Sequence, residues 1–251
     1  MRVALKISYD GLKFHGFARQ PNQNTVEGQI LDILNEDKII KNHKDAVFRY
    51  ASRTDKFVSS LGNVMAFNTE VPIYQILSKF NKTFDIIPYA FKKVDNSFFP
   101  RYANLRWYRY YLKNDEYDLE SILSTTSYFI GAHDFSNFAR IEKNKNPKRT
   151  IENIVINSND NFFIIDFYAK TYLWNQIRRI ISAIIKVEQN KITRDDINFA
   201  LKNPHHKVDF GLASAEPLIL QDIIYDFNFR IDMKQLQKVN NLKKKIISRL
   251  I

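Results

Sequence analysis

Segments with the two-residue period of a strand alternate with segments that have the period of a helix, and this succession occurs twice along the chain. Strands are predicted over residues 3–9, 46–51, 61–68, 89–95, 104–113, 151–157 and 162–169, and within 217–229. Helices are predicted after Thr25, from Pro72, and over 118–130, 172–188 and 194–202. This mixture predicts an α+β fold with two similar lobes rather than one continuous barrel.

The predicted join between the lobes lies near Phe99-Pro100, which gives an N-terminal lobe of residues 1–98 and a second lobe of 99–230. Residues 231–251 are predicted to form a basic amphipathic helix, with apolar side chains at helical spacing and a lysine cluster from Lys243 to Lys245. A surface helix packed by its apolar stripe is the first interpretation. An arm that contacts RNA or a second subunit is the alternative.

Charge and composition narrow the class of protein. The 251 residues carry 38 Lys and Arg against 27 Asp and Glu, a net charge of +11 that favours a polyanionic partner. The absence of cysteine excludes disulfides, thiolate nucleophiles and Cys-ligated zinc. The N-terminus is too short and polar for a signal peptide, and no run of about 18 apolar residues occurs, so a soluble cytoplasmic protein without membrane contact is expected.

Two segments of the sequence place a charged residue beside apolar runs. The stretch FRYASRTDKFVSSLGNVMAFN places Asp55 between two strand-like runs, where a turn former is the simplest interpretation. On the predicted helix, Arg178 shares a face with Trp174, Ile181 and Ile185, so it is expected to be partly buried. A buried guanidinium requires an anion or several acceptors, and a structural ion pair would also satisfy it.

The strand LRWYRYYL has two distinct faces. Leu105, Trp107, Arg109 and Tyr111 occupy one face, and the other face carries Arg106, Tyr108, Tyr110 and Leu112. Phenol rings beside a cation suit stacking on unpaired bases, although aromatic residues also favour strands for packing alone.

Five motifs in order make the chain resemble the TruA-type tRNA pseudouridine synthase family over most of residues 3–225. The motifs are ISYDGLKFHGFARQPNQNTVEGQI, SRTDKFVSSLGNVMAF, RWYRY, GAHDFSNFAR and LWNQIRRIISAI. By this resemblance, Asp55 is the catalytic aspartate, Tyr108 the active-site tyrosine and Arg178 the active-site arginine. The candidate RNA contacts are Arg53, Tyr9, Phe14, Arg19, Arg101, Arg106 and Arg140.

The resemblance also implies a fold and a reaction. It implies two ferredoxin-like, RNP-like lobes that form an extended, mainly antiparallel sheet, with helices on one side and a central catalytic cleft. It implies a homodimer that binds tRNA and converts uridines of the anticodon stem-loop, at positions 38 to 40, to pseudouridine without cofactor or metal. Asp55 would attack C1′ or remove a C2′ proton, Arg178 would pair with Asp55, and Tyr108 would pack on the target base.

The sequence departs from the family's pattern within the aspartate loop. Phe57 and Ser52 stand where glycine is usual, so a backbone conformation restricted to glycine is not expected at residue 57. A noncatalytic tRNA-binding protein or chaperone that retains the fold is therefore an alternative. A metal-dependent nuclease or phosphotransferase using Asp55 with Asp134 or Asp166 is a second alternative, although no carboxylate cluster has metal-ligand spacing.

Overall fold

The computed structural model describes residues 1–80, 85–114 and 117–251. Two compact units form the chain. Unit 1 contains Met1–Asn104 and Ile219–Ile251, and unit 2 contains Leu105–Leu218. Unit 1 is therefore built from both ends of the sequence, whereas the expected division placed the join at residue 98 and set residues 231–251 apart.

The sheet of unit 1 follows the ferredoxin-like order. Its strands are β1 (Arg2–Tyr9), β2 (Arg49–Tyr50), β3 (Ser59–Asn68), β4 (Ile86–Val94), β10 (Leu218–Ile224) and β11 (Arg230–Ile231). Strand β1 lies between β3 and β4 and is antiparallel to both, and β2 pairs with β3. The resulting order β4-β1-β3-β2, with intervening helices, is the βαββαβ arrangement.

Strand β10 extends this sheet at the other half of β3. It pairs parallel to β3 through Ile219–Ser59 and Leu220–Ser60, whereas β2 pairs with Ala66 and Met65 of the same strand. A short strand from the end of the sequence therefore fixes the beginning of β3.

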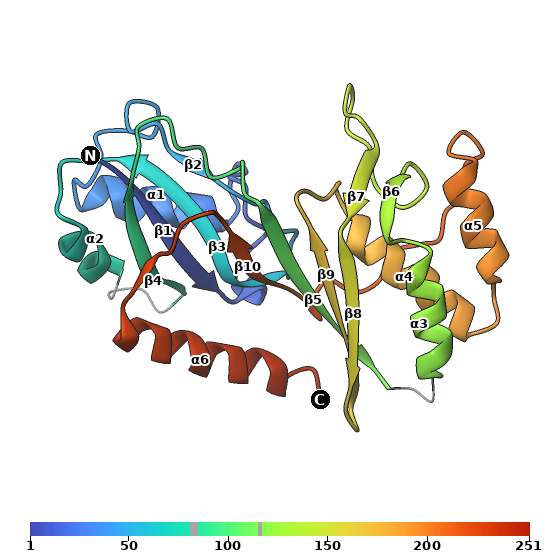
Figure 1. Ribbon diagram of the computed structural model, residues 1–251. Coiled ribbons are helices and arrows are strands. Elements are labelled where there is room, and N and C mark those ends of the chain that lie inside the picture. The colour runs from blue at the N-terminus through green and yellow to red at the C-terminus, as the bar shows by residue number, and fades with distance from the viewer. Residues whose placement is uncertain (81–84, 115–116) are drawn as a thin grey trace. The chain divides into compact units, whose positions relative to one another are not determined.

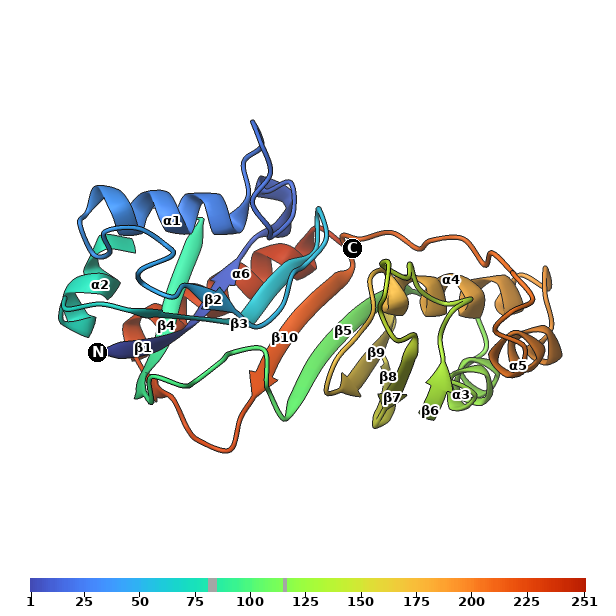
Figure 2. The same ribbon diagram turned by 90° about the horizontal axis from the view of Figure 1, so that it is seen from above.

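Helices α1 (Val26–Glu36) and α2 (Ile73–Phe80) lie on one face of the unit 1 sheet, as Figure 2 shows. Thr25 begins α1 as predicted, because its hydroxyl oxygen accepts a hydrogen bond from the Gly28 amide at 3.2 Å. The predicted apolar stripe of α1 is buried with the inward side chains of β1 and β3 in one core. Helix α6 (Met233–Ser248) lies alongside β4 (Figure 1), and its Val239 and Ile246 are buried.

Unit 2 also combines helices with an antiparallel sheet, but its sheet is smaller. Strands β5 (Leu105–Lys113), β9 (Phe162–Ala169) and β8 (Asn153–Ser158) form an antiparallel sheet in that order, which is the ferredoxin-like order of first, third and second strands. Strands β6 (Gly131–Asp134) and β7 (Lys148–Ile151) form a separate antiparallel pair. The helices are α3 (Leu119–Ser127), α4 (Gln176–Glu188) and α5 (Arg194–Lys202). The predicted α+β class, with mainly antiparallel pairing, is confirmed.

Several predicted bounds were wrong. The strand expected over 46–51 has only two residues in its ladder, and the helix expected over 118–130 ends at Ser127. The helix expected from residue 172 begins at Gln176, because Asn175 has the left-handed φ of 62° and breaks the helical path. The pair β6-β7, strand β11 and a 3₁₀ turn, η1 (Gly11–Lys13), were not predicted. None of the helices in the described ranges combines the length and hydropathy needed to cross a bilayer.

Candidate active site

Asp55 lies in the loop that joins β2 to β3 in unit 1. The loop turns back immediately after it, because the Val58 amide donates a hydrogen bond to the Asp55 carbonyl oxygen at 3.1 Å. Phe57 lies within this turn at φ 71°, and the residue is 40% exposed. The expectation that residue 57 would avoid this conformation was therefore wrong. Asp55 itself is partly exposed, so solvent reaches it within unit 1.

A buried polar network holds the residues before Asp55. The Asn63 amide group donates to the Ser52 carbonyl oxygen at 2.9 Å and to the Tyr9 hydroxyl at 3.3 Å, and the Tyr9 and Thr54 hydroxyls are 2.8 Å apart. Asn63 and Tyr9 have no exposed surface, so these hydrogen bonds are shielded from competing water. The network fixes the backbone on which Asp55 sits.

The segment from Tyr9 to Phe17 supports the same loop from behind. The Gly11 amide donates to the Ser59 hydroxyl at 2.9 Å, and a Cβ atom at Gly11 would lie 2.4 Å from the Val58 carbonyl carbon. Only glycine permits this approach. The Phe17 amide donates to the Thr54 carbonyl oxygen at 3.0 Å. The first of the five motifs therefore packs against the second, which contains Asp55.

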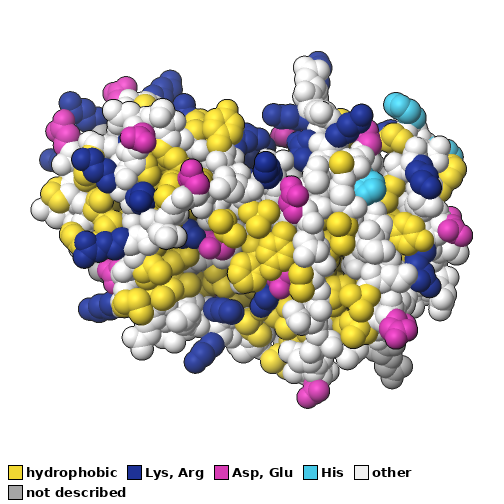
Figure 3. Space-filling model, viewed as in Figure 1, with side chains coloured by type: hydrophobic (Ala, Val, Ile, Leu, Met, Phe, Trp, Pro, Cys, Tyr) yellow, Lys and Arg dark blue, Asp and Glu magenta, His cyan; other side chains and the backbone are white. Residues whose placement is uncertain are grey.

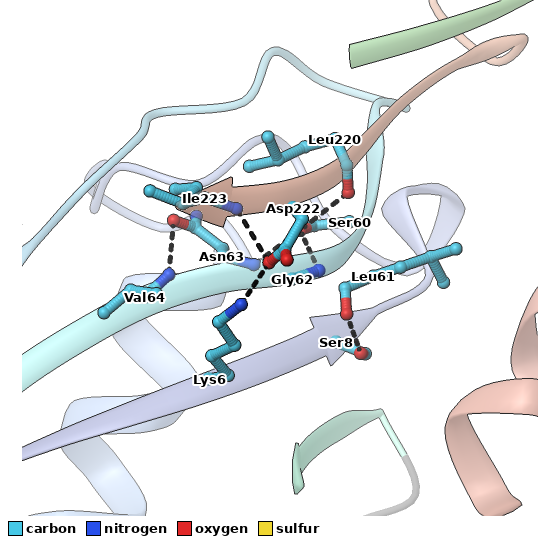
Figure 4. A network of polar contacts seen from close by, with 10 residues as sticks. All are labelled: Lys6, Ser8, Ser60, Leu61, Gly62, Asn63, Val64, Leu220, Asp222 and Ile223. Atoms are coloured by element: carbon cyan, nitrogen blue, oxygen red, sulfur yellow. Dashed lines mark hydrogen bonds and ion pairs between the residues drawn. The ribbon is translucent and has the colours of Figure 1, made fainter. Parts of the chain in front are cut away.

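A second polar network fixes the strand that begins where the loop ends (Figure 4). The Ser60 hydroxyl accepts from the amides of Gly62 and Asn63 at 3.2 and 3.0 Å and donates to the Leu220 carbonyl oxygen at 3.3 Å. Lys6 on β1 forms an ion pair with Asp222 on β10. The Ser60–Leu220 hydrogen bond ties β10 to the first residues of β3, and the ion pair ties β10 to β1.

Apart from Tyr9, the residues of these two networks were not among the predicted site residues. Asn63 shares its strand face with Met65 and Phe67, so it is a polar residue at the beginning of a run of buried apolar positions. A polar residue at such a position requires a buried partner, which was the signal that could have identified it.

Arg178 lies on α4 of unit 2 and is partly buried, as predicted. Its Nε–H donates to the Ala213 carbonyl oxygen at 2.9 Å, and the Ala213 amide donates to the Arg178 carbonyl oxygen at 3.2 Å. This pair of hydrogen bonds fixes the orientation of the guanidinium. The neighbouring Arg179 forms an ion pair with Asp209, with an N–O distance of 2.7 Å. Hydrogen bonds from the Gly211 amide and from Arg179 lower the pKa of Asp209.

Tyr108 lies on β5 in unit 2, on the buried face of the strand. Its ring meets that of Tyr172 edge to face, with centroids 5.3 Å apart, and burial raises the pKa of Tyr172 well above its ordinary value. Burial also raises the pKa of Tyr110, while the positive charge of Arg178 acts in the opposite direction. Arg178 and the tyrosine face of β5 therefore lie close enough to interact within one unit.

The candidate RNA contacts differ in exposure. Tyr9, Phe14 and Arg106 are buried. The rings of Tyr9 and Phe14 pack against each other in the segment that supports the Asp55 loop, with centroids 6.1 Å apart. The four exposed residues of this set are Arg19, Arg53, Arg101 and Arg140. Lys and Arg side chains are spread over the visible faces of both units rather than gathered in one patch (Figure 3). The exposed arginines are the members of the set that a polyanion can reach in this structure.

Arg140 ends the segment GAHDFSNFAR next to the beginning of α4. Its guanidinium lies 4.1 Å from the centroid of the Trp174 ring, and its amide donates to the Trp174 carbonyl oxygen at 2.8 Å. Trp174 is 43% exposed and precedes the helix, so it does not share the helical face with Arg178 as predicted. The stacked pair forms a cationic aromatic surface.

The rest of that segment is structural. Asn137 is buried, its amide group donates to the carbonyl oxygens of Ala200 and His206 at 3.0 Å each, and its side-chain oxygen accepts from the Val208 amide at 3.2 Å. Phe138 stacks on Phe210 with centroids 4.7 Å apart. The segment thus fixes the loop that follows α5.

The carboxylates considered for a metal-dependent reaction have other partners. Asp166 accepts two 2.8 Å hydrogen bonds from Arg109 and one of 2.6 Å from the Trp107 indole, and the contact with Asp166 raises the pKa of Arg109. Asp134 accepts from the amide and hydroxyl of Ser136. Within the described residues, no three or more His, Asp or Glu side chains are grouped as metal ligands.

Comparisons with known proteins define the class. A family model described as tRNA pseudouridine synthase matches residues 126–226. A tRNA pseudouridine synthase A of Thermococcus sibiricus is 39% identical over 246 residues, covering 95% of this chain and 91% of that protein. Proteins of the same name from Pyrococcus horikoshii and Methanothermobacter thermautotrophicus are 38% and 35% identical, and the matches cover 95% and 92% of this chain and 90% and 83% of theirs.

These relatives match over nearly the whole chain. The chain therefore belongs to the tRNA pseudouridine synthase A family, whose members are isomerases. Among solved structures, a Cbf5–Nop10–Gar1 complex matches with a TM-score of 0.39 and 15% identity, over 73% of this chain and 44% of that one. A similarity at that level carries no further conclusion.

Proposed function

We propose that this protein isomerises uridine to pseudouridine in tRNA, with Asp55 as the group that begins the reaction. Family membership together with the fixed aspartate loop carries this proposal. Converting uridine requires cleavage of the C1′–N1 bond, rotation of the uracil and a new bond from C1′ to C5, so a single carboxylate can begin it. Asp55 either attacks C1′ or removes a C2′ proton, and both routes need the carboxylate in its ionised form.

The other two candidate residues, Arg178 and Tyr108, control the charge of Asp55 and the position of the target base. Arg178 pairs with Asp55, which keeps the carboxylate ionised and directed at the ribose, because an opposite charge within hydrogen-bond reach favours the ionised form. The hydrogen bond from Arg178 to Ala213 supports this role by fixing the guanidinium before substrate binds. Tyr108 packs on the target base and assists removal of the C5 proton.

The substrate is tRNA, and the target uridines are those at positions 38 to 40 of the anticodon stem-loop. The net charge of +11 and the exposed arginines support an RNA partner. Arg53, in the same loop as Asp55, holds the target nucleotide out of its stack. The functional assembly is a cytoplasmic homodimer, and light scattering that gives only the monomer mass of 29.7 kDa at micromolar concentration would contradict the dimer.

The test is tritium release from tRNA transcripts that contain 5-tritiated uridine, with chelator present and no metal added. We expect release by the wild type and a loss of about a thousandfold or more for Asp55→Asn, as for removal of an essential catalytic group. The matched control is Asp32→Asn, which changes an exposed aspartate of α1 and should retain full activity. Transcripts with cytidine at positions 38 to 40 test the target site.

Tight tRNA binding without tritium release would refute the catalytic proposal. That result would favour the alternative of a noncatalytic tRNA-binding protein. Equal release by the wild type and Asp55→Asn would refute the role of Asp55 alone.

A further inference from the structure

A pocket with a volume of about 340 Å³ lies within unit 1, and its lining residues do not include those of the Asp55 loop. Helix α6, the turn η1, the end of α2 and the beginning of β4 surround it. Apolar side chains, including Phe80, Ile87 and Leu242, form its walls. Its volume lies within the range of small-ligand sites, which begins at about 300 Å³.

Lysine side chains give the pocket a positive rim. Lys13, Lys238 and Lys245 line it together with one carboxylate, Asp10. Asp10 is buried and forms a two-bond ion pair with Arg249, so its charge is already balanced. Lys13 also pairs with Asp85, but both side chains of that pair are exposed enough for water to weaken it.

The combination of apolar walls and a basic rim selects a ligand class. A flat apolar ring with negative charges on either side fits it, and an unstacked nucleotide between two phosphates has that form. Asn241, which is exposed, also lines the pocket, and its amide group can hydrogen-bond to the edge of a base.

We propose that this pocket binds one unstacked nucleotide of the RNA substrate, at a position different from the uridine that reacts. The proposal rests on the proposed function, because it takes tRNA as the ligand. The position of the pocket supports it. Lys13 ends η1 and lines the pocket, while Gly11 begins η1 and contacts the backbone of Val58 in the catalytic loop. One short turn therefore touches both sites.

The first test compares two pairs of substitutions on the same helix. Lys238→Ala with Lys245→Ala removes the pocket lysines of α6, and Lys243→Ala with Lys244→Ala removes the same charge from positions that do not line the pocket. We expect the first pair to weaken tRNA binding about fivefold more than the control pair. It should also reduce the salt dependence, by about 0.7 in the log–log slope for each lost phosphate contact. Equal effects of the two pairs would overturn the proposal.

The second test locates the nucleotide. The photoreactive residue p-benzoylphenylalanine replaces Leu242 in the pocket or, as control, Leu236, which does not line it. Crosslinking from position 242 to one tRNA nucleotide that is not a converted uridine supports the proposal. Crosslinking that is absent, or that is the same from both positions, overturns it.

Two controls distinguish a nucleotide from a lipid and separate the pocket from the catalytic reaction. Binding of phosphatidylglycerol vesicles that the pocket pair abolishes, with tRNA affinity unchanged, would assign the pocket to a lipid and overturn the proposal. Tritium release by the wild type is measured in parallel. If release fails while the crosslink and the affinity difference persist, the proposed function is wrong and the nucleotide pocket still holds.

Discussion

Replacing Arg249 should destabilise unit 1 in a pH-dependent way. Arg249, the residue after α6, forms two hydrogen bonds of 2.7 and 2.9 Å with the carboxylate of Asp10. Asp10 follows β1 and also caps η1 by accepting from the Leu12 amide at 3.2 Å. The substitution Arg249→Gln removes the charge and leaves a buried carboxylate without its cation.

The cost follows from burial. Removing one partner of a fully buried ion pair costs about 3–5 kcal/mol. The Asp10 side chain is only 3% exposed, but that of Arg249 is 26% exposed, so water reaches part of the pair. We therefore expect a loss of about 2–3 kcal/mol, which corresponds to a decrease in Tm of about 5–10 °C for a chain of this size.

The sign of the pH dependence follows from the pKa of Asp10. Burial alone would raise this pKa, but the hydrogen bonds from Arg249 and Leu12 and the charges of Arg249 and Lys245 outweigh burial and lower it. Because the pKa in the folded state lies below that in the unfolded chain, the pair contributes fully above a pH of about 4. Its contribution is lost as the pH falls through the lower, folded-state value.

Calorimetry of the wild type and Arg249→Gln, near neutral pH and at successively lower pH, measures this effect. The difference in Tm should be largest near neutral pH and should narrow once the pH falls below the unfolded-state pKa. Arg194→Gln, which removes an exposed arginine of α5, is the control and should change stability by about 0.5 kcal/mol or less. A difference of about 1 °C or less for Arg249→Gln at every pH would refute the reasoning, because water would then solvate Asp10 as well as Arg249 does.

Substitutions at three further residues test local supports of the two units. Asn63→Ala should cost about 2–3 kcal/mol in urea unfolding and lower kcat in the tritium assay, because the loop before Asp55 loses its buried hydrogen bonds; an unchanged kcat would contradict the positioning role. Phe57→Gly should be nearly neutral, since relief of the left-handed backbone, about 1 kcal/mol, is offset by the entropy of glycine, whereas Phe57→Val should be destabilising by about 1 kcal/mol or more. Asn137→Ala should cost about 2–4 kcal/mol in unit 2, and a loss below about 1 kcal/mol would show that water replaces its hydrogen bonds.

The local part of the fold was predictable from the sequence. Helix α1 was located by Thr25 and by the spacing of its apolar residues, because capping and amphipathic burial depend on neighbours a few residues away. Strand β5 was located by its alternating faces for the same reason. The beginning of α4 was missed because Asn175 takes a left-handed conformation that the apolar pattern around it does not reveal.

The long-range part was not predictable in the same way. Asp10 and Arg249 are 239 positions apart, and no periodicity connects them. The parallel pairing of β10 with β3 likewise depends on a chain return that local patterns do not encode.

The Asp55 loop was identified as a candidate site only by its resemblance to a family. Its support by Asn63 depends on contacts with Tyr9 and Ser52, which lie 54 and 11 positions away in the chain. Phe57 also adopts a left-handed backbone conformation that bulky residues disfavour. Its ring is exposed, and the Lys56 Nζ atom lies over it, 4.7 Å from the ring centroid.

The discontinuity of unit 1 has a consequence for how the protein is made. Residues 1–104 emerge from the ribosome first. The ion pairs Lys6–Asp222 and Asp10–Arg249 and the pairing of β10 with β3 can form only after the final part of the chain has been synthesised. Unit 2, whose residues are continuous, emerges complete before unit 1 does. We expect a stalled chain that ends near residue 218 to leave the Asp55 loop without part of its anchorage. Loss of the last few residues would then weaken the N-terminal half of the protein more than the middle.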